Sequence, residues 1–296
     1  MKRIILLALA VALAVCCTEQ NTTAKKTGWD KDGLKGKVKS ERVITYEAVE
    51  KFGELTKGDI SINYSSNYYI GLAKNNSLTK YDDKGNRTER TIYRSDGKLF
   101  AKQTYKYDDK GYMTEMNMSG ESRVVMKEIY KYDGNGNHIE SDFYHPDINL
   151  SNKETYKYDD RGNMIEENMY NPDGSLKGKQ TYKYDNKGNK TDENEYKSDG
   201  SLEKKYTYKY DDRGNETEVN LYYSDGSLYY IKGTYKYDDN GNITEVNRYD
   251  SDDSLFGQMT YKYKYDNKGN WIEKIEYEGE ANTAKEITER EIEYHE

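Results

Sequence analysis

Histidine and cysteine, which often mark catalytic and metal-binding sites, are few in this 296-residue chain. The three histidines are His138, His145 and His295. His138 and His145 flank one expected strand, so their spacing does not bring them together. We find no nucleophile elbow, phosphate-binding loop or CxxC motif. We therefore expect no catalytic residue, no metal site and no cofactor, and we predict that the protein is not an enzyme.

Residues 133–137 (DGNGN) place oxygen-bearing side chains at alternate positions, as calcium-binding loops do. An EF-hand loop needs Gly at its sixth position and Glu at its twelfth. This chain has His138 and Tyr144 there. The run is therefore interpreted as a turn. The 54 acidic residues are abundant because they recur with the repeat described below.

Residues 1–17 have the pattern of a secretory signal. Lys2 and Arg3 precede a short apolar run that ends at Cys16-Cys17. The run resembles a bacterial lipobox, in which the cysteine is lipidated and becomes the mature N-terminus. We predict lipid attachment at Cys17, with Cys16 as the alternative and a signal peptide with chance cysteines as a third interpretation. The protein would then be exported and anchored in the bacterial cell envelope, at the periplasmic face or the cell surface.

Net charge argues against nucleic acid as a partner. Removing Lys2 and Arg3 from the 46 basic residues leaves 44 against 54 acidic ones, a net charge of −10. The chain has no other cysteine, so an exported form would be held by its sheet without disulfides.

A module of about 26 residues recurs through the chain. Its mark is Tyr-Asp, and the steps between successive pairs are 26, 25, 26, 26, 26, 27 and 28 residues. The Tyr of each pair is Tyr81, Tyr107, Tyr132, Tyr158, Tyr184, Tyr210, Tyr237 or Tyr265. Such periodicity indicates repeated supersecondary units, each stabilised by its neighbours.

Each module contains two turn signals separated by stretches of strand length. The first turn keeps a glycine in all eight copies: Gly85, Gly111, Gly136, Gly162, Gly188, Gly214, Gly241 and Gly269. We expect a positive φ there, in a hairpin loop with a G1-type bulge. The second turn is looser, with Asp-Gly in only some copies, such as Asp199-Gly200. We predict one β-hairpin per module.

The period of two predicts the two faces of each hairpin. Tyr182 and Tyr184 share one face, and Lys183 points to the other. If the turn Asp pairs with its closing residue, Tyr182 lies opposite Asp192, and Tyr208 lies opposite Glu218. Met116, Ile165, Val219, Leu221 and Val246 would then lie on the lysine face.

Composition limits how the hairpins assemble. The chain has 33 Tyr but only 4 Phe and 2 Trp, and 34% of its residues are charged. A compact sandwich would need more aliphatic residues. Disorder is disfavoured by the regular turns. Lysine in every first strand argues against a transmembrane barrel. We predict an all-β, antiparallel hairpin meander of about sixteen strands, in an extended or coiled single-layer sheet or a partly closed shell.

The expected organisation has five parts. Residues 1–17 are the signal peptide, 18–33 a polar tether, 34–76 an atypical capping segment, 77–276 the eight repeats, and 277–296 a capping strand. Within the first cap, residues 38–46 alternate as a strand does, whereas 47–55 are expected to form a short helix or a loop insertion. Within the second cap, residues 287–294 are expected to form the last strand. Caps would cover the open ends of the array.

The run Tyr-Lys-Tyr-Asp-Asp-x-Gly-Asn, as at residues 208–215, resembles the YD repeat of the Rhs and teneurin families over roughly residues 78–275. In those families the repeats form a spiralling β-sheet that builds a hollow shell, and Rhs shells enclose a C-terminal toxin. This chain has fewer modules and no expected toxin domain, so encapsulation does not carry over. Its layout also resembles small bacterial YD-repeat lipoproteins of unassigned role. The resemblance implies carbohydrate as one class of partner.

Two functions follow from these patterns. In the first, the protein is a lipid-anchored binding or adhesion module for a polymeric partner, either a glycan or an envelope protein. In the second, it is a structural envelope spacer or assembly component without a small ligand. Exposed tyrosines on a concave face would favour the first function, and fully buried tyrosines would favour the second.

Overall fold

The computed structural model describes residues 26–61, 76–120, 124–145 and 148–296. This part contains one short helix, α1 (Gly28–Asp32), and nineteen strands. The first ten strands are β1 (Val38–Lys51), β2 (Glu54–Ile60), β3 (Asn76–Tyr81), β4 (Arg87–Tyr93), β5 (Leu99–Tyr107), β6 (Met113–Ser119), β7 (Val124–Tyr132), β8 (His138–His145), β9 (Ile148–Tyr158) and β10 (Met164–Tyr170). The others are β11 (Leu176–Tyr184), β12 (Lys190–Lys197), β13 (Leu202–Tyr210), β14 (Glu216–Tyr223), β15 (Leu228–Tyr237), β16 (Ile243–Tyr249), β17 (Leu255–Tyr265), β18 (Trp271–Glu278) and β19 (Thr283–Tyr294).

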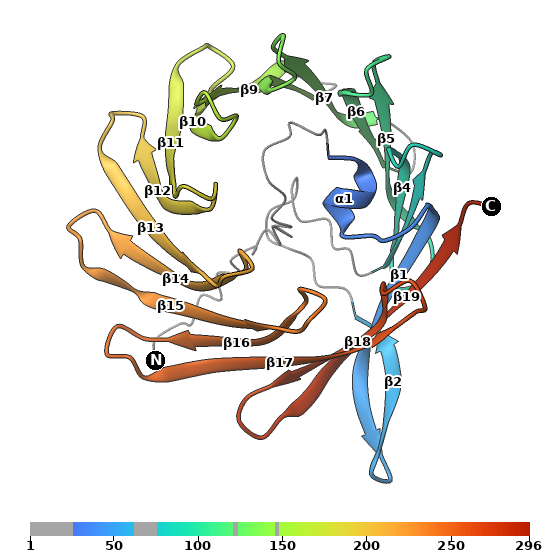
Figure 1. The fold of residues 1–296 in the computed structure, drawn as a ribbon. Helices are drawn as coiled ribbons and strands as arrows, with labels where there is room; N and C mark the ends of the chain where they lie inside the picture. The colour runs from blue at the N-terminus through green and yellow to red at the C-terminus, as the bar shows by residue number, and fades with distance from the viewer. Residues whose placement is uncertain (1–25, 62–75, 121–123, 146–147) are drawn as a thin grey trace.

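The strands form one antiparallel meander that closes into a barrel (Figure 1). From β3 to β19 each strand pairs with the next, as the hairpin repeat predicts. β1 then uses both of its edges. One edge pairs with β19 from Val38 to Glu47, and the other pairs with β3 from Ser40 to Ile44. Among the described residues the ring therefore has 18 strands. The expected extended or coiled open sheet is wrong, because the two ends of the array pair through β1.

The terminal segments therefore close the ring instead of capping two open ends. The predicted strands at 38–46 and 287–294 are present, but they pair with each other. The helix or loop expected at 47–55 is a β-hairpin. β1 continues to Lys51, and a turn at Phe52-Gly53 leads into β2, which pairs only with β1. Figure 1 shows this hairpin projecting away from the ring. The expected tether at 18–33 is also interrupted, because it contains α1.

The first turn of each module has the predicted chemistry. All eight repeat glycines have φ between 76° and 87°. In the turn that starts at Asp185, the carboxylate Oδ1 accepts hydrogen bonds from the backbone N–H groups of Lys187 and Asn189, at 2.8 and 2.9 Å. The Asn189 side chain donates to Asp185 Oδ2 at 2.9 Å. The turn thus satisfies its own polar groups and fixes the hairpin register.

A β-bulge follows each of these turns and shifts the register by one residue. Tyr184 lies opposite Lys190, but Lys183 lies opposite Asp192, so one extra residue stands between the two pairs. The predicted pairing of Tyr182 with Asp192 is therefore wrong, and Tyr182 lies opposite Glu193.

The same shift corrects the other face assignments. Tyr208 lies opposite Val219 and not Glu218. Met116, Leu221 and Val246 also pair with tyrosines, at Tyr105, Tyr206 and Tyr235, so they share the tyrosine face and not the lysine face. Ile165 is the extra residue of its own bulge.

The tyrosine that precedes each turn joins its hairpin to the preceding one. The Tyr184 hydroxyl donates to the backbone carbonyl of Met164, the first residue of the previous returning strand, at 2.6 Å. This carbonyl lies beyond the last backbone pair of β10 with β11. The same bond, at 2.7–2.9 Å, links Tyr107 to Arg87, Tyr132 to Met113, Tyr158 to His138, Tyr210 to Lys190, Tyr237 to Glu216 and Tyr263 to Ile243. In the last module Tyr263 takes this role, and Tyr265 donates to Asp238 in the preceding turn.

Helix α1 lies inside the ring (Figure 1) and contacts the first module turn, and the residues that follow the helix contact the last module turn. Thr27 and Asp30 form a capping box that starts the helix. The Trp29 ring packs on Gly85, where a Cβ atom would lie 2.5 Å from it. At the other end of the array, the Lys35 N–H donates to Asn270 Oδ1 at 2.7 Å. Gly85 therefore serves both the turn and this contact.

A buried charged group holds the closure together. Glu41 on β1 and Arg290 on β19 are 7% and 6% exposed and form an ion pair. The guanidinium of Arg290 lies 4.2 Å from the centre of the Trp271 ring. Asp32 at the end of α1 accepts from the Tyr81 hydroxyl at 2.7 Å and from Arg87 Nε at 2.6 Å. This group connects β1, β3, β4, β19 and α1.

Removing one hydroxyl that joins two hairpins should destabilise the barrel. In Tyr184→Phe the Met164 carbonyl loses its donor, and we expect the free energy of unfolding to fall by about 1–2 kcal/mol. Tyr223→Phe is the control, because that side chain is 45% exposed. It should change stability by less than about 0.5 kcal/mol. Urea denaturation measures both variants, and equal midpoints would contradict the role of the Tyr184 bond.

Candidate functional site: the inner wall of the barrel

The two faces of the sheet have different chemistry. The tyrosine face is the inner one, because Tyr81 and Arg87 on it contact α1 inside the ring. Side chains fill the interior only in barrels of about eight strands, and wider barrels leave a lumen. Most inner side chains of β12 and β13 are accordingly half-buried and not buried. The inner face is therefore a lining accessible from the lumen.

The outer face carries a regular set of ion pairs. In every hairpin the lysine before the turn Tyr lies opposite an acidic residue of the returning strand, which we call the repeat acid. The pairs are Lys80–Glu89, Lys106–Glu115, Lys131–Glu140, Lys157–Glu166, Lys209–Glu218, Lys236–Glu245 and Lys264–Glu273. In the remaining hairpin Lys183 lies opposite Asp192, and the Asp192 carboxylate forms its ion pair with Lys205, at 3.3 Å.

Glu115 illustrates the environment of these acids. It accepts hydrogen bonds from Lys106 at 2.7 Å and from Lys127 at 2.8 Å, and also from Asn117 at 2.7 Å. These partners, led by Lys106, lower the pKa of Glu115 to about 2. Barrels that lie in a lipid bilayer present an apolar band on this face. The charged outer face is instead suited to water.

Part of the inner face is apolar. Ile92, Ala101, Met116, Met118 and Met126, from β4 to β7, form a buried cluster. These side chains pack side by side along the wall and stabilise that arc of the barrel.

From β7 to β13 the inner face carries both tyrosines and glutamates. We call this set the tyrosine–acid wall: Tyr130, Tyr156, Tyr182 and Tyr208 with Glu128, Glu154, Glu167 and Glu193. The hydroxyls of Tyr156, Tyr182 and Tyr208 donate to Glu154, Glu167 and Glu193 at 2.7, 2.9 and 2.8 Å. Tyr130 likewise donates to Glu128. Each phenol is therefore fixed by a hydrogen bond, with its ring on the inner face of the sheet.

Lys190 places one ammonium group on this wall. Its Nζ lies 2.6 Å from Glu193 Oε2. It also lies 4.5 Å from the centre of the Tyr208 ring and 5.5 Å from that of Tyr182. Both distances are within the range of cation–π attraction. The niche thus combines one carboxylate with two aromatic rings.

Burial perturbs several wall carboxyls. It raises the pKa of Glu128 and Glu167, although each accepts a hydrogen bond from a tyrosine that opposes the shift. Glu216 on β14 lies opposite Tyr210. Burial raises the pKa of Glu216 to about 7, with Lys190 opposing the shift and Glu193 adding to it. The inner face therefore holds carboxyls whose pKa is raised by burial, and the pKa of Glu216 among them lies near neutral pH.

The inner face also holds the one arrangement that looks like a catalytic group. Ser141 Oγ lies 3.1 Å from both His138 Nε2 and Glu128 Oε1. His138 Nε2 also lies 2.9 Å from the Glu140 carbonyl, so this nitrogen carries the proton and cannot accept the serine proton. Ser141 is only 1% exposed. The arrangement is therefore a buried hydrogen-bond network and not a nucleophile with its base.

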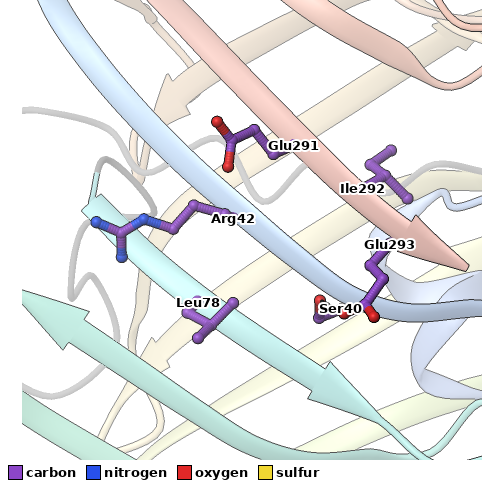
Figure 2. A pocket seen from close by; sticks show the side chains of 6 residues that line it. All are labelled: Ser40, Arg42, Leu78, Glu291, Ile292 and Glu293. Carbon is purple, nitrogen blue, oxygen red and sulfur yellow. Dashed lines mark hydrogen bonds between the residues drawn. The ribbon is translucent and has the colours of Figure 1, made fainter.

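The hollow at the closure lies on the outer side (Figure 2). Ser40, Arg42, Leu78, Glu291, Ile292 and Glu293 line it. Arg42 donates to Asn76 at 2.8 Å, and Glu293 accepts from Lys39 at 2.7 Å and from Ser40 at 3.1 Å. Arg42 and Glu293 are thus engaged with neighbouring residues of the sheet, so the hollow offers no chemistry comparable with that of the inner wall.

The structure places the predicted site residues as follows. The repeat glycines form the turns, and the repeat tyrosines mainly bond the neighbouring hairpin. Cys16 and Cys17 lie outside the described residues. Asp133 bonds the N–H groups of Asn135 and Asn137 in its own turn, at 2.9 and 2.8 Å, as the turn interpretation predicts. Within the described ranges, no group of three His, Cys, Asp or Glu residues could hold a metal ion.

Sequence reasoning missed the glutamates of the wall. Glu167 and Glu193 follow the repeat acids Glu166 and Asp192 directly, and the bulge decides which of the two neighbours faces the lumen. The usable signal was a second acid, adjacent to the repeat acid and absent from most modules.

Comparison with solved structures gives distant likenesses. A porin-like protein from Bacteroides uniformis aligns with 12% identity and a TM-score of 0.43, over 87% of this chain and 96% of that chain. A porin-like protein from Bacteroides vulgatus aligns with 12% identity and a TM-score of 0.35, over 88% and 99%. The TcdB2-TccC3 structure aligns with 13% identity and a TM-score of 0.36, over 84% of this chain but 16% of that chain.

No protein-family profile matches this chain, and no curated protein sequence matches it. The resemblance to YD repeats of Rhs and teneurin proteins stays a prediction. In the part of the chain that the structure describes, no helix has the length and apolar composition needed to span a bilayer.

The raised pKa of Glu216 gives a prediction about pH. The folded state binds its proton up to about pH 7, whereas an ordinary Glu releases it near 4.5. The stabilisation is therefore complete below pH 4.5 and is lost as the pH rises through 7. Glu216→Gln removes this dependence. The difference in free energy of unfolding, Glu216→Gln minus wild type, should therefore rise by about 1–2 kcal/mol between pH 4.5 and pH 8. This range allows for partial solvation of the carboxyl.

Glu115→Gln is the matched control on the outer face. Because its pKa is about 2, the Glu115 carboxylate stays ionised above pH 4.5. The stability difference between Glu115→Gln and wild type should then change by less than about 0.5 kcal/mol from pH 4.5 to 8, because only the unfolded chain still takes up protons near pH 4.5. Urea titrations at several pH values measure both, and a constant difference for Glu216→Gln would contradict the assignment.

Proposed function

We propose that the protein is a non-enzymatic binding barrel of the bacterial cell envelope that holds a polymeric partner on its inner wall. One observation carries this proposal: the repeat displays tyrosine rings at regular steps on the concave face, and glutamates accompany them from β7 to β13. A surface built from one repeated unit suits a ligand that also repeats. Each contact can then be weak, because a second contact of the same chain forms at a high effective concentration.

The exposure of the tyrosines supports binding over a purely structural role. Most wall tyrosines are half-buried, so part of each ring faces the lumen, although Tyr182 is buried at 9% exposure. Tyrosine rings are frequent contact groups in protein interfaces. The structural spacer remains the second candidate, because the hydroxyls of the turn tyrosines are used within the sheet itself.

The envelope location rests on the N-terminal sequence and on the charged outer face. The signal-like segment implies export, and Cys17, or Cys16 in the alternative, would carry the lipid. An outer face of paired lysines and acids suits an aqueous compartment. We therefore place the barrel in water beside the membrane, attached through its N-terminal lipid, with no nucleic acid as partner.

Lipid attachment can be tested directly. Cys17→Ser should abolish acyl labelling and release the protein from the membrane fraction, because the thiol carries the lipid. Cys16→Ser is the control and should keep both the label and the membrane association. Labelled, membrane-bound Cys17→Ser together with unlabelled Cys16→Ser would assign the lipid to Cys16, and label on both variants would exclude this anchor.

The binding role can be tested with two adjacent residues of β13. Tyr206 faces the lumen opposite Leu221, and Thr207 faces outward. We expect Tyr206→Ala to weaken retention in gels that contain a binding polysaccharide or polypeptide by roughly tenfold, equal to about 1.4 kcal/mol. Thr207→Ala should bind as wild type does. Equal retention of the two variants, or no retention by any polymer, would contradict binding on the inner wall.

A further inference from the structure

Lys190 shows which chemical group the inner wall stabilises. Its ammonium lies between the Tyr182 and Tyr208 rings, 5.5 and 4.5 Å from their centres, and 2.6 Å from Glu193. The Tyr208 hydroxyl orients Glu193 by donating to the same oxygen at 2.8 Å. The chain thus fills one niche with an alkylammonium of its own. Rings and carboxylate together stabilise such a cation more than either does alone.

The preceding module repeats this niche without its cation. Met164 occupies the position equivalent to Lys190, because both lie opposite the turn Tyr of their hairpin. Around Met164 the flanking tyrosines are Tyr156 and Tyr182, and Glu167 corresponds to Glu193. The Tyr182 hydroxyl orients Glu167 at 2.9 Å as Tyr208 orients Glu193. This second niche has the rings and the carboxylate but carries an uncharged thioether.

Three of the four wall glutamates have no lysine or arginine partner within the described part of the chain. Glu193 bonds Lys190 at 2.6 Å and Glu195 lies 3.6 Å from Lys204. Among the described lysines and arginines, none forms an ion pair with Glu128, Glu154 or Glu167. Their hydrogen-bond donors are neutral hydroxyl groups. Burial raises the pKa of Glu128 and Glu167, and the charge of Glu154 adds to both shifts. A bound cation would relieve this repulsion.

The spacing of the niches sets the form of the ligand. Equivalent positions on successive hairpins are two strands apart, which is about 10 Å across the sheet. A polyproline II helix has three residues per turn and rises about 3.1 Å per residue, so every third side chain points the same way at steps of about 9 Å. Lysines at every third position of such a segment would match the niches.

We propose that the tyrosine–acid wall binds an extended lysine-bearing polypeptide, with each lysine ammonium between tyrosine rings and a wall glutamate. This rests on the proposed function and names the partner class for the same surface. Lysine is favoured over other amines because the side chain that fills the Glu193 niche is itself a lysine. Lys190 then competes with the ligand for one niche.

The test uses the chain from residue 17 onward carrying Cys17→Ser, and two synthetic peptides that repeat Lys-Pro-Pro or Gln-Pro-Pro. Calorimetry should show binding of the lysine peptide only. Glu167→Gln should lower its affinity about tenfold, as expected for loss of one charge-assisted hydrogen bond. Glu166→Gln is the matched control: it is the adjacent acid, but it faces outward and pairs with Lys157 at 2.6 Å. Its affinity should equal that of wild type.

Lys190→Met gives a readout that loss of structure would not give. It vacates the Glu193 niche, so the affinity for the lysine peptide should rise several-fold. Equal weakening by Glu166→Gln and Glu167→Gln would overturn the proposal in favour of general charge attraction. Failure of the lysine peptide, with Tyr206-dependent retention of a glycan or an amino-sugar polymer, would overturn the lysine assignment and leave the proposed function standing. Failure of every polymer would overturn both.

Discussion

The bulge after each strict turn is the constraint on which the rest of the barrel depends. A single extra residue at the start of the returning strand puts the repeat acid opposite lysine on the outer face. It also leaves a carbonyl outside the strand ladder, and the tyrosine of the next hairpin bonds that carbonyl. The turn glycine, the bulge and the tyrosine therefore act as one unit. Their joint recurrence in the sequence follows, because a hairpin that lacked one of them would lose its register or its bond to the neighbour.

Closure depends on contacts that are remote in sequence and is stabilised differently from the repeat. Every hairpin pairs with its neighbour locally, yet an open array would leave two long unpaired edges. β1 removes both edges by pairing with β3 and β19. The buried pair of Glu41 and Arg290, with Trp271 beneath the guanidinium, lies at this junction. Buried ion pairs add little net stability, but a wrong partner would leave a buried charge unpaired, so the pair favours the correct register.

The sequence was sufficient for the hairpins but not for their faces or for the barrel. The Asp-x-x-Gly-Asn turns, the positive φ at the repeat glycines and the terminal strand at 287–294 followed from local turn chemistry and alternation. Asp192 and Glu193 show the limit. Adjacent residues in a strand face opposite ways, and which of them faced the lumen depended on the extra residue at 191, which spacing alone did not reveal. Closure required the pairing of residues about 250 positions apart, and a period of 26 residues fits an open sheet equally well.

On the outer face every acid of the repeat is paired with a lysine, whereas on the inner wall most glutamates are not. Outside, each repeat acid has a lysine, and the paired charges stabilise the surface weakly but consistently. Inside, Glu154 and Glu167 accept from phenols and pair with no lysine or arginine of the described residues, although burial makes an unpaired carboxylate costly. A sequence that supplies lysine at every outer position could have supplied it inside as well, and at Lys190 it does. Local violations of otherwise consistent rules tend to mark functional surfaces. Since the hydroxyls of the wall are occupied by the sheet and its acids, recognition is left to the ring faces and the carboxylates, which are the two groups that surround the ammonium of Lys190.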